Sequence, residues 1–116
     1  MPSAPLPPRV RILVACPDLL IRSRIISACQ AASVLPEIVN AADLTSAQPG
    51  DLAIVDLEAP GVLDAIPAAV GRGARVVGFC GHLDTGLLTA GTVAGAEAMP
   101  RGAFLATLPR LVEGAK

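Results

Sequence analysis

Short apolar runs separated by polar, proline- and glycine-containing segments recur along the chain. The runs are four to six residues long, which suits strands and is too short for a membrane span. Several are apolar at consecutive positions, a pattern typical of parallel strands that are covered by helices on both faces. The expected strands are residues 10–15, 34–39, 52–55, 75–80 and 96–99.

The segment between the first two expected strands shows the spacing of apolar residues that predicts a helix. Asp18 stands where a helix N-cap is expected, and residues 22–24 are polar and predicted to face outward. The apolar positions that recur at helical spacing are Ile21, Ile25, Ala28 and Ala32. Farther along, residues 43–47 leave room for about one helical turn.

The later intervals predict three more helices. One is short, from about residue 65 to 70, with Pro67 tolerated only in its first turn. Asp84 is expected to cap the next, which continues through Ala94. The last has an inward stripe and is kinked or divided by Pro109. That stripe is Phe104, Leu108 and Leu111.

Alternating strands and helices predict an α/β domain. The expected architecture is a doubly wound, five-stranded parallel sheet of order 2-1-3-4-5, in three α/β/α layers with shortened second and third helices. Residues 1–8 hold several prolines and are expected to form a flexible arm, followed by a single domain at 9–116.

Composition excludes several classes of function. Aromatic residues make up 2% and the net charge is −1, so neither base stacking nor phosphate attraction supports direct nucleic-acid binding. The N-terminus has no apolar signal segment, and no membrane-spanning stretch is present. Three widely spaced cysteines without a CxxC motif suit reduced thiols. We therefore expect a cytoplasmic protein.

Asp56 is the most informative residue for function. It ends the apolar run 52–55 and is followed by the turn residues Pro60 and Gly61. Ligands of parallel α/β sheets bind at the carboxyl ends of the strands, which is where Asp56 is expected to lie. A purely structural role, capping the following turn, is the simpler interpretation.

Four segments, residues 12–22, 56–61, 76–82 and 95–101, resemble bacterial response-regulator receiver domains. The resemblance implies that Asp56 corresponds to the phosphoacceptor. It also places Cys16 and Pro17 at the acidic pair that holds Mg²⁺ in the family. Cys80 stands where the family has Thr or Ser, and Arg101 lies one residue before the usual Lys.

These departures weaken the phosphorylation chemistry that the resemblance implies. Mg²⁺ prefers oxygen ligands, whereas Cys16 offers sulfur and Pro17 offers no side-chain ligand. Asp18 is expected to be engaged as a helix cap. We therefore expect a metal-free, cofactor-free interaction module, not an enzyme. Its degenerate acidic pocket around Asp56 consists of Cys16, Pro17, Asp18, Glu58, Cys80 and Arg101.

Two alternatives remain open. A residual phosphorelay receiver would accept phosphate on Asp56, with Asp18 and Glu58 holding Mg²⁺. A soft-metal site built from Cys16, Cys80, His82 and Asp56 has the residue types that zinc prefers, although buried cysteines usually act as small hydrophobes. The expected spacing of Cys16 and Cys80, about 10 Å across three strands, excludes a disulfide between them.

The last helix predicts an interaction surface. Its apolar arc is broader than one core face needs, and the preceding helix offers Gly86 and Gly91 for close approach. Receivers generally use this helix 4–strand 5–helix 5 face for partners, so we expect a protein partner or a homodimer here. Scattered surface apolar residues are the simpler alternative. The expected contacts are Leu87, Leu105, Leu108 and Val112, with Arg101 and Arg110 at the rim.

Overall fold

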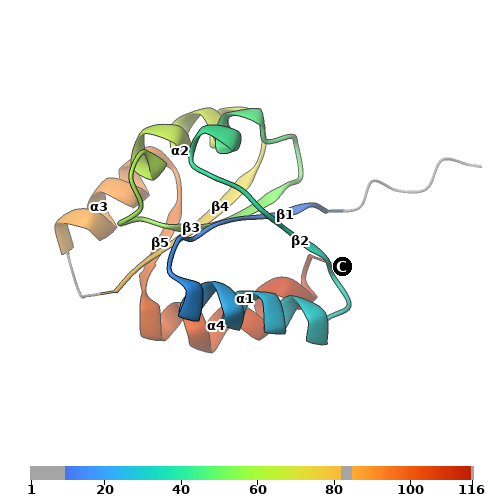
Figure 1. The fold of residues 1–116 in the computed structure, drawn as a ribbon. Helices are drawn as coiled ribbons and strands as arrows, with labels where there is room; N and C mark the ends of the chain where they lie inside the picture. Colours follow the sequence, from blue (N-terminus) through green and yellow to red (C-terminus); the bar gives the residue numbers. More distant parts are fainter. Residues whose placement is uncertain (1–9, 82–84, 116) are drawn as a thin grey trace, which may run out of the picture.

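A parallel sheet of five strands in the order β2-β1-β3-β4-β5 forms the centre of the protein (Figure 1). The computed structural model describes residues 10–81 and 85–115. Every neighbouring pair of strands runs parallel, which confirms the predicted doubly wound sheet. The strands are β1 (Ile12–Ala15), β2 (Pro36–Ile38), β3 (Leu52–Asp56), β4 (Arg75–Cys80) and β5 (Glu97–Pro100).

Helices cover both faces of the sheet and produce the three expected layers (Figure 1). One face carries α1 (Leu19–Ala31) and α4 (Arg101–Glu113), which pack together. The other carries the 3₁₀ turn η1 (Ala42–Ser46), α2 (Val62–Gly71) and α3 (Thr85–Ala94). The single turn η1 matches the room that the sequence left between β2 and β3.

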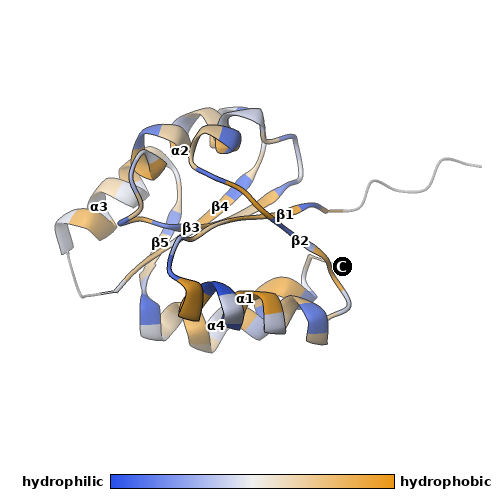
Figure 2. Cartoon of the chain, viewed as in Figure 1, coloured by the Kyte–Doolittle hydropathy of each residue, from blue (hydrophilic) through white to orange (hydrophobic). Residues whose placement is uncertain are grey.

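The two faces bury separate cores, because side chains alternate between the faces of a strand. Ile12 and Val14 pack toward α1 and α4, whereas Leu13 and Ala15 pack toward η1, α2 and α3. Figure 2 shows apolar colour along the central strands. Two phenylalanines, Phe79 of β4 and Phe104 of α4, stack with ring centroids 4.5 Å apart at 14°. These aromatic contacts fix α4 against the sheet.

Two helices differ from their predicted form. α2 begins at Val62, three residues earlier than expected, because Gly61 adopts a φ of 80° and turns the chain directly into the helix. Pro67 therefore lies in its interior and not in its first turn. Pro109 does not divide α4, which is assigned as one helix through Glu113. Both prolines are exposed, so water can bind the carbonyl oxygens that lack a backbone donor.

The predicted interaction surface is wrong at two of its four residues. Leu108 is 3% exposed and Val112 is 1% exposed, because the phase of α4 turns both toward the sheet. The burial of Leu108 confirms instead its place in the predicted inward stripe with Phe104 and Leu111. Leu87 and Leu105 are half-buried against the core. Gly91 is also buried, so it faces inward and not toward a partner.

Some predictions fall on residues outside the description. Asp84, the expected cap of α3, and His82 both lie in the gap at 82–84, and the proline-rich arm lies before residue 10. Within the described part of the chain, no helix is long and apolar enough to cross a membrane. The cytoplasmic location stays a prediction.

Candidate functional site

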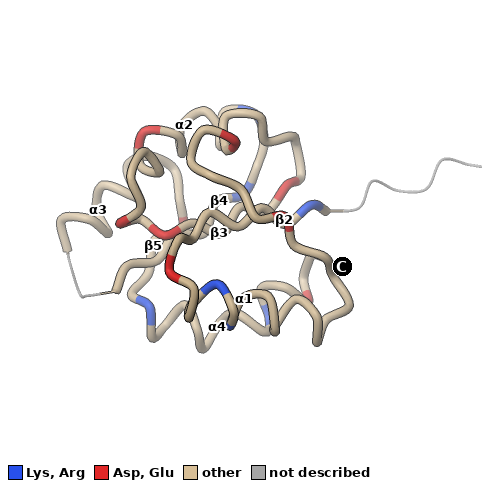
Figure 3. Tube along the Cα trace, in the orientation of Figure 1, with Lys and Arg blue, Asp and Glu red and all other residues tan. Residues whose placement is uncertain are grey.

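The strand register brings four predicted site residues to the carboxyl edge of the sheet. Ala15 pairs with Val55, so Cys16 follows β1 beside the position where Asp56 ends β3. Cys80 pairs with Pro100, so Arg101 begins α4 directly beyond the end of β5. Figure 3 shows acidic positions at this edge of the sheet, with basic positions on α1 and α4 below them.

Asp56 is held by the turn that follows it. Its Oδ1 accepts a hydrogen bond from the backbone N–H of Glu58 at 2.9 Å, and its carbonyl accepts one from Ala59 at 3.0 Å. Burial raises the pKa of Asp56, and the negative charges of Glu58 and Asp18 raise it further. The Glu58 N–H bond and the charge of Arg101 act in the opposite direction. Asp56 is thus a half-buried carboxyl group whose ionised form is disfavoured.

Asp18 is the N-cap of α1, as predicted. Its Oδ1 accepts hydrogen bonds from the backbone N–H groups of Leu20 at 3.0 Å and Ile21 at 3.3 Å. These are two of the amides that a helix start otherwise leaves without acceptors. The carboxylate is therefore oriented toward its own helix.

Cys16 occupies a buried position beside Asp56. It is 2% exposed, and its Sγ lies 3.6 Å from the carbonyl oxygen of Asp18. Burial raises the pKa of the Cys16 thiol to about 11, with the charge of Asp56 contributing in the same direction. At neutral pH this residue is a neutral thiol, which is a poor nucleophile and a poor metal ligand.

Glu58 and Arg101 meet at Gly81. The backbone N–H of Gly81 donates a 2.8 Å hydrogen bond to Oε2 of Glu58. A Cβ placed on Gly81 would collide with the guanidinium of Arg101 and lie 3.1 Å from the same Glu58 oxygen. The loop after β3, the end of β4 and the start of α4 therefore converge at a residue without a side chain. The predicted cation at Arg101 lies in the electrostatic neighbourhood of Asp56.

The donor set does not fit Mg²⁺, the ion that the resemblance to receiver domains implies. Mg²⁺ needs near-octahedral oxygen ligands, usually carboxylates and waters. At the corresponding place this chain offers the neutral sulfur of Cys16, the ring of Pro17 and an Asp18 carboxylate that accepts helix N–H bonds. Among residues 10–81 and 85–115, no three His, Cys, Asp or Glu side chains are grouped to hold a metal ion.

The two cysteines of the proposed soft-metal site, Cys16 and Cys80, lie on opposite faces of the sheet. Cys16 belongs to the core beneath α1 and α4, whereas Cys80 belongs to the core beneath α2 and α3. Strand alternation directs the two side chains to opposite faces, so they are not brought to one ion. Neither forms a disulfide, and neither does Cys29.

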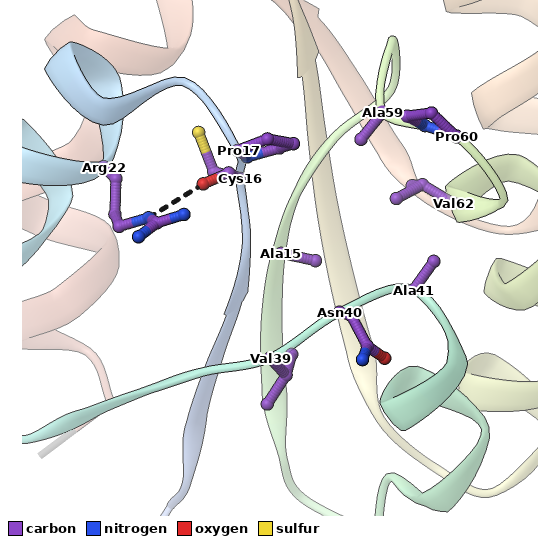
Figure 4. Close-up of a pocket in the computed structure, with 10 residues that line it drawn as sticks. All are labelled: Ala15, Cys16, Pro17, Arg22, Val39, Asn40, Ala41, Ala59, Pro60 and Val62. Carbon is purple, nitrogen blue, oxygen red and sulfur yellow. Dashed lines mark hydrogen bonds between the residues drawn. The ribbon is translucent and has the colours of Figure 1, made fainter.

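Sequence reasoning missed a small pocket beside this site. Its volume is about 220 Å³, and it opens where β1, β2 and β3 end (Figure 4). Arg22 was expected to face outward, yet it is half-buried and its Nε donates to the carbonyl of Cys16 at 3.0 Å. The only sequence signal was its position between Ile21 and Ile25, at the edge of the buried helix stripe. The lining residues are Ala15, Cys16, Pro17, Arg22, Val39, Asn40, Ala41, Ala59, Pro60 and Val62.

Comparison with known proteins gives matches at the level of structure. No protein-family model matches the sequence, and no curated protein matches it. The signal receiver domain of NarL from Mycobacterium tuberculosis is similar, with a TM-score of 0.73 at 19% identity over 94% of this chain and 98% of that one. A response regulator from Thermotoga maritima gives 0.71 at 17% identity over 92% and 97%.

A third match carries a different description. The pilus assembly protein CpaE from Caulobacter crescentus CB15 has a TM-score of 0.63 at 19% identity, over 92% of this chain and 93% of that chain. Identities this low establish a shared fold and leave the activity to be argued from the site. The protein has the fold of the response-regulator receiver domains.

Proposed function

We propose that this protein is a receiver-like regulatory module that binds a protein partner without metal-dependent phosphorylation. The proposal rests on the structural role of the Asp18 carboxylate. Its carboxylate caps α1, and the neighbouring Cys16 is a neutral buried thiol. At the end of β1, therefore, neither Cys16 nor Asp18 presents a carboxylate that could share a divalent cation with Asp56. Phosphoryl transfer depends on cations that neutralise the transferring oxygens.

A magnesium titration tests this proposal. We expect no saturable change in the amide shifts of Asp56, Glu58 and Cys16 as Mg²⁺ is raised at constant ionic strength. The matched variant is Cys16→Asp, which restores a carboxylate at the end of β1 and should create magnesium-dependent shifts. Saturable shifts of the wild-type protein at submillimolar Mg²⁺ would overturn the proposal.

The second candidate is a residual phosphorelay receiver that accepts phosphate on Asp56. One observation favours it: the charge of Arg101 stabilises the ionised form of Asp56 from the start of α4. A cation at this point suits a carboxylate that must attack phosphorus and then carry additional negative charge. In this reading Asp18 and Glu58 would hold the Mg²⁺.

Acetyl phosphate with and without Mg²⁺ discriminates the two functions, with phosphate-affinity gels as the readout. The first proposal expects no retarded band. A retarded band that persists in Asp64→Ala and disappears in Asp56→Ala would support the second. Asp64 is an exposed carboxylate in the first turn of α2 and serves as the matched control.

We propose that the partner binds the face formed by α3, β5 and α4. The centre of this face lies closer to α3 than in the sequence-based prediction, which placed it on the last helix. Leu108 and Val112 are in the core, whereas Val93 of α3 is 81% exposed and α3 carries no charged residue. Leu87 and Leu105 flank it as half-buried contacts. A second copy of the chain is the simplest occupant, because closed two-fold symmetry is the commonest way to cover such a face.

Sedimentation at tens of micromolar tests self-association. Wild type should sediment as a dimer and Val93→Glu as a monomer. Ser23→Glu, which adds the same charge at an exposed position of α1, should remain dimeric. A monomeric wild type would end the homodimer proposal and leave a different protein as the partner.

A further inference from the structure

The pocket beside Asp56 has one apolar side and one polar side. Its apolar wall consists of short aliphatic and proline side chains from the ends of β1 and β2, the loop after β3 and the start of α2 (Figure 4). This wall is formed by Ala15, Val39, Ala41, Ala59, Pro60 and Val62. Such a surface binds hydrocarbon and offers little to water or to an inorganic ion.

Arg22 gives the pocket a positive charge. Only one of its guanidinium nitrogens, Nε, is used by the protein, in the hydrogen bond to the carbonyl of Cys16. Within the described residues, neither terminal nitrogen of Arg22 has a hydrogen-bond acceptor or an ion-pair partner. The Nε bond fixes the side chain, so the remaining N–H groups form a pre-oriented donor for a planar anion.

Asn40 adds a second unused donor. Its Oδ1 accepts a 3.0 Å hydrogen bond from the backbone N–H of Asp43, which assigns the oxygen and leaves the NH₂ group. No protein acceptor for that NH₂ group is present in the described part of the chain. Figure 4 shows this amide directed toward η1, away from the Arg22 side of the pocket, so Arg22 is the lining side chain placed to hold a carboxylate.

No carboxylate is among the residues that line the pocket, and Arg22 is the charged side chain among them. Cys16 is the titratable lining residue beside Arg22, and its thiol is neutral at pH 7 because its pKa is raised to about 11. Three acids stand close to lining residues without lining the pocket themselves: Asp18 and Asp56 near Cys16, and Asp43, whose Oδ2 accepts the backbone N–H of Asn40 at 3.1 Å. Asp18 accepts helix N–H bonds and Asp56 accepts the Glu58 N–H bond. An anion in the pocket would therefore meet Arg22 as its first charged neighbour.

The volume limits the part of a ligand that the pocket can enclose. At about 30 Å³ for each water-sized group, that part is about seven non-hydrogen atoms. It is below the range of drug-sized sites, about 300–1,000 Å³. A carboxylate with a hydrocarbon tail of this size matches both sides of the pocket.

We propose that this pocket binds a short aliphatic monocarboxylate of about five carbons, with its carboxylate on Arg22 and its hydrocarbon chain against the apolar wall. Binding would tie α1 to the loops after β2 and β3, next to Asp56. The inference goes beyond the proposed function and does not depend on whether Asp56 accepts phosphate.

The test is an amide-shift titration of the whole protein with 3-methylbutanoate at constant ionic strength. We expect saturable shifts confined to the lining residues, with a dissociation constant on the order of millimolar for so small a ligand. Two further ligands separate the contributions. The alcohol 3-methylbutan-1-ol has the same hydrocarbon without the charge, and inorganic phosphate has charge without the hydrocarbon; both should bind at least about tenfold more weakly.

Four variants complete the test. Arg22→Gln should raise the dissociation constant at least about tenfold, and Arg22→Lys should recover part of the loss. Arg24→Gln, which removes an exposed arginine of the same helix, should bind like wild type. Ala59→Leu fills the pocket without touching Arg22 and should abolish binding, so it tests the site even if Arg22→Gln perturbs α1. The amide spectrum of each variant reports its folding directly.

Several results would overturn the inference. They are shifts that do not saturate, shifts scattered away from the lining residues, equal binding of the alcohol or of phosphate, and equal affinities of Arg22→Gln and Arg24→Gln. A failed phosphorylation or magnesium assay would leave this site untouched, so the two proposals are tested separately.

Discussion

The side chain of Leu57 occupies the space beside Gly78: a Cβ placed on Gly78 would lie only 2.6 Å from Leu57 Cδ2. On its other side, a Cβ on Gly91 of α3 would lie 3.1 Å from Leu57 Cδ1. Leu57 is 2% exposed and directly follows Asp56. Because both glycines lack a side chain, Leu57 can pack between β4 and α3, directly beside the candidate site.

Replacing Gly78 with alanine should therefore destabilise the protein by about 1–3 kcal/mol, because the added methyl overpacks a buried contact. Urea unfolding measures the change. Gly71→Ala is the control, since a Cβ at Gly71 meets nothing within 4 Å and lies in α2, where alanine is the better helix former. Equal effects of the two substitutions would refute the packing explanation. Combining Gly78→Ala with Leu57→Ala should cost less than the sum of the single changes.

The raised pKa of Asp56 predicts a pH-dependent gain from Asp56→Asn. Burial makes the folded protein hold the Asp56 proton more tightly than the unfolded chain does. The stability from this group is then fully present below its ordinary value of 3.8 and is lost as pH rises through the folded pKa. At pH 7 the charged carboxylate is unfavourable, and the asparagine, which keeps an oxygen for the Glu58 N–H, should raise the melting temperature.

This gain should shrink as pH is lowered to about 3.5, where Asp56 is largely protonated in both states. Thermal melts across this range check the prediction. Asp64→Asn, at an exposed carboxylate, should give no gain at neutral pH. An Asp56→Asn protein that melts below wild type at pH 7 would show that the ionised carboxylate stabilises the fold.

Arg11 and Arg75 offer a matched test of ion-pair burial. Arg11 donates from Nε at 3.2 Å and from Nη2 at 2.7 Å to Asp51, which is 4% exposed. Arg75 donates in the same two-pronged way to Glu97, but both of these side chains are more than half exposed. The substitution Arg11→Met removes both arginine hydrogen bonds from the Asp51 carboxylate. Among the described residues, the backbone N–H of Gln48 then remains as its hydrogen-bond donor.

We expect Arg11→Met to cost about 2–4 kcal/mol, because a buried charge loses its partner. Arg75→Met should cost less than about 1 kcal/mol, because water screens and replaces an exposed pair. Chemical denaturation of the two variants side by side is the measurement. Similar losses would mean that the burial of Asp51 does not control the energy of its pair.

The backbone conformation of Ser33 predicts that replacing this residue with glycine stabilises the protein. It follows α1 with a φ of 59°, a left-handed conformation that costs most residues about 1–2 kcal/mol and glycine little. Ser33→Gly should stabilise the protein by roughly 0.5–1 kcal/mol. Ser27→Gly, at an exposed position inside α1, should destabilise it by a similar amount. Thermal melts should therefore move in opposite directions, and a parallel shift would contradict the conformational argument.

Local patterns were sufficient for the elements and their order. Consecutive apolar residues predicted β3 and β4, since a strand buried on both faces leaves no polar position. Asp18 was predictable as the cap of α1, because capping depends on residues two and three positions away. Alternating strands and helices indicated a doubly wound sheet with right-handed crossovers, and the flavodoxin-like order 2-1-3-4-5, chosen among the common orders of such sheets, is confirmed.

Only the tertiary structure decided which side of each element is buried. α4 is apolar over a broad arc, so the sequence allowed Leu108 both in the inward stripe and on the interaction surface, and it left Val112 on that surface; packing placed both in the core. Cys16 and Cys80 were correctly placed at the ends of the two strands that flank β3, yet the pleat directs them to opposite faces of the sheet. The pair of Arg11 and Asp51 joins positions 40 residues apart, for which no local pattern exists.

The candidate site divides in the same way. The sequence determined that Asp56 ends a buried strand and which residue types surround it, because strand ends and turns are local features. It did not determine that Arg22 turns inward, that Asn40 lines the same pocket or that Glu58 and Arg101 meet at Gly81. These depend on how α1, α4 and three loops approach one sheet edge, and that approach is set by the packing of the two cores.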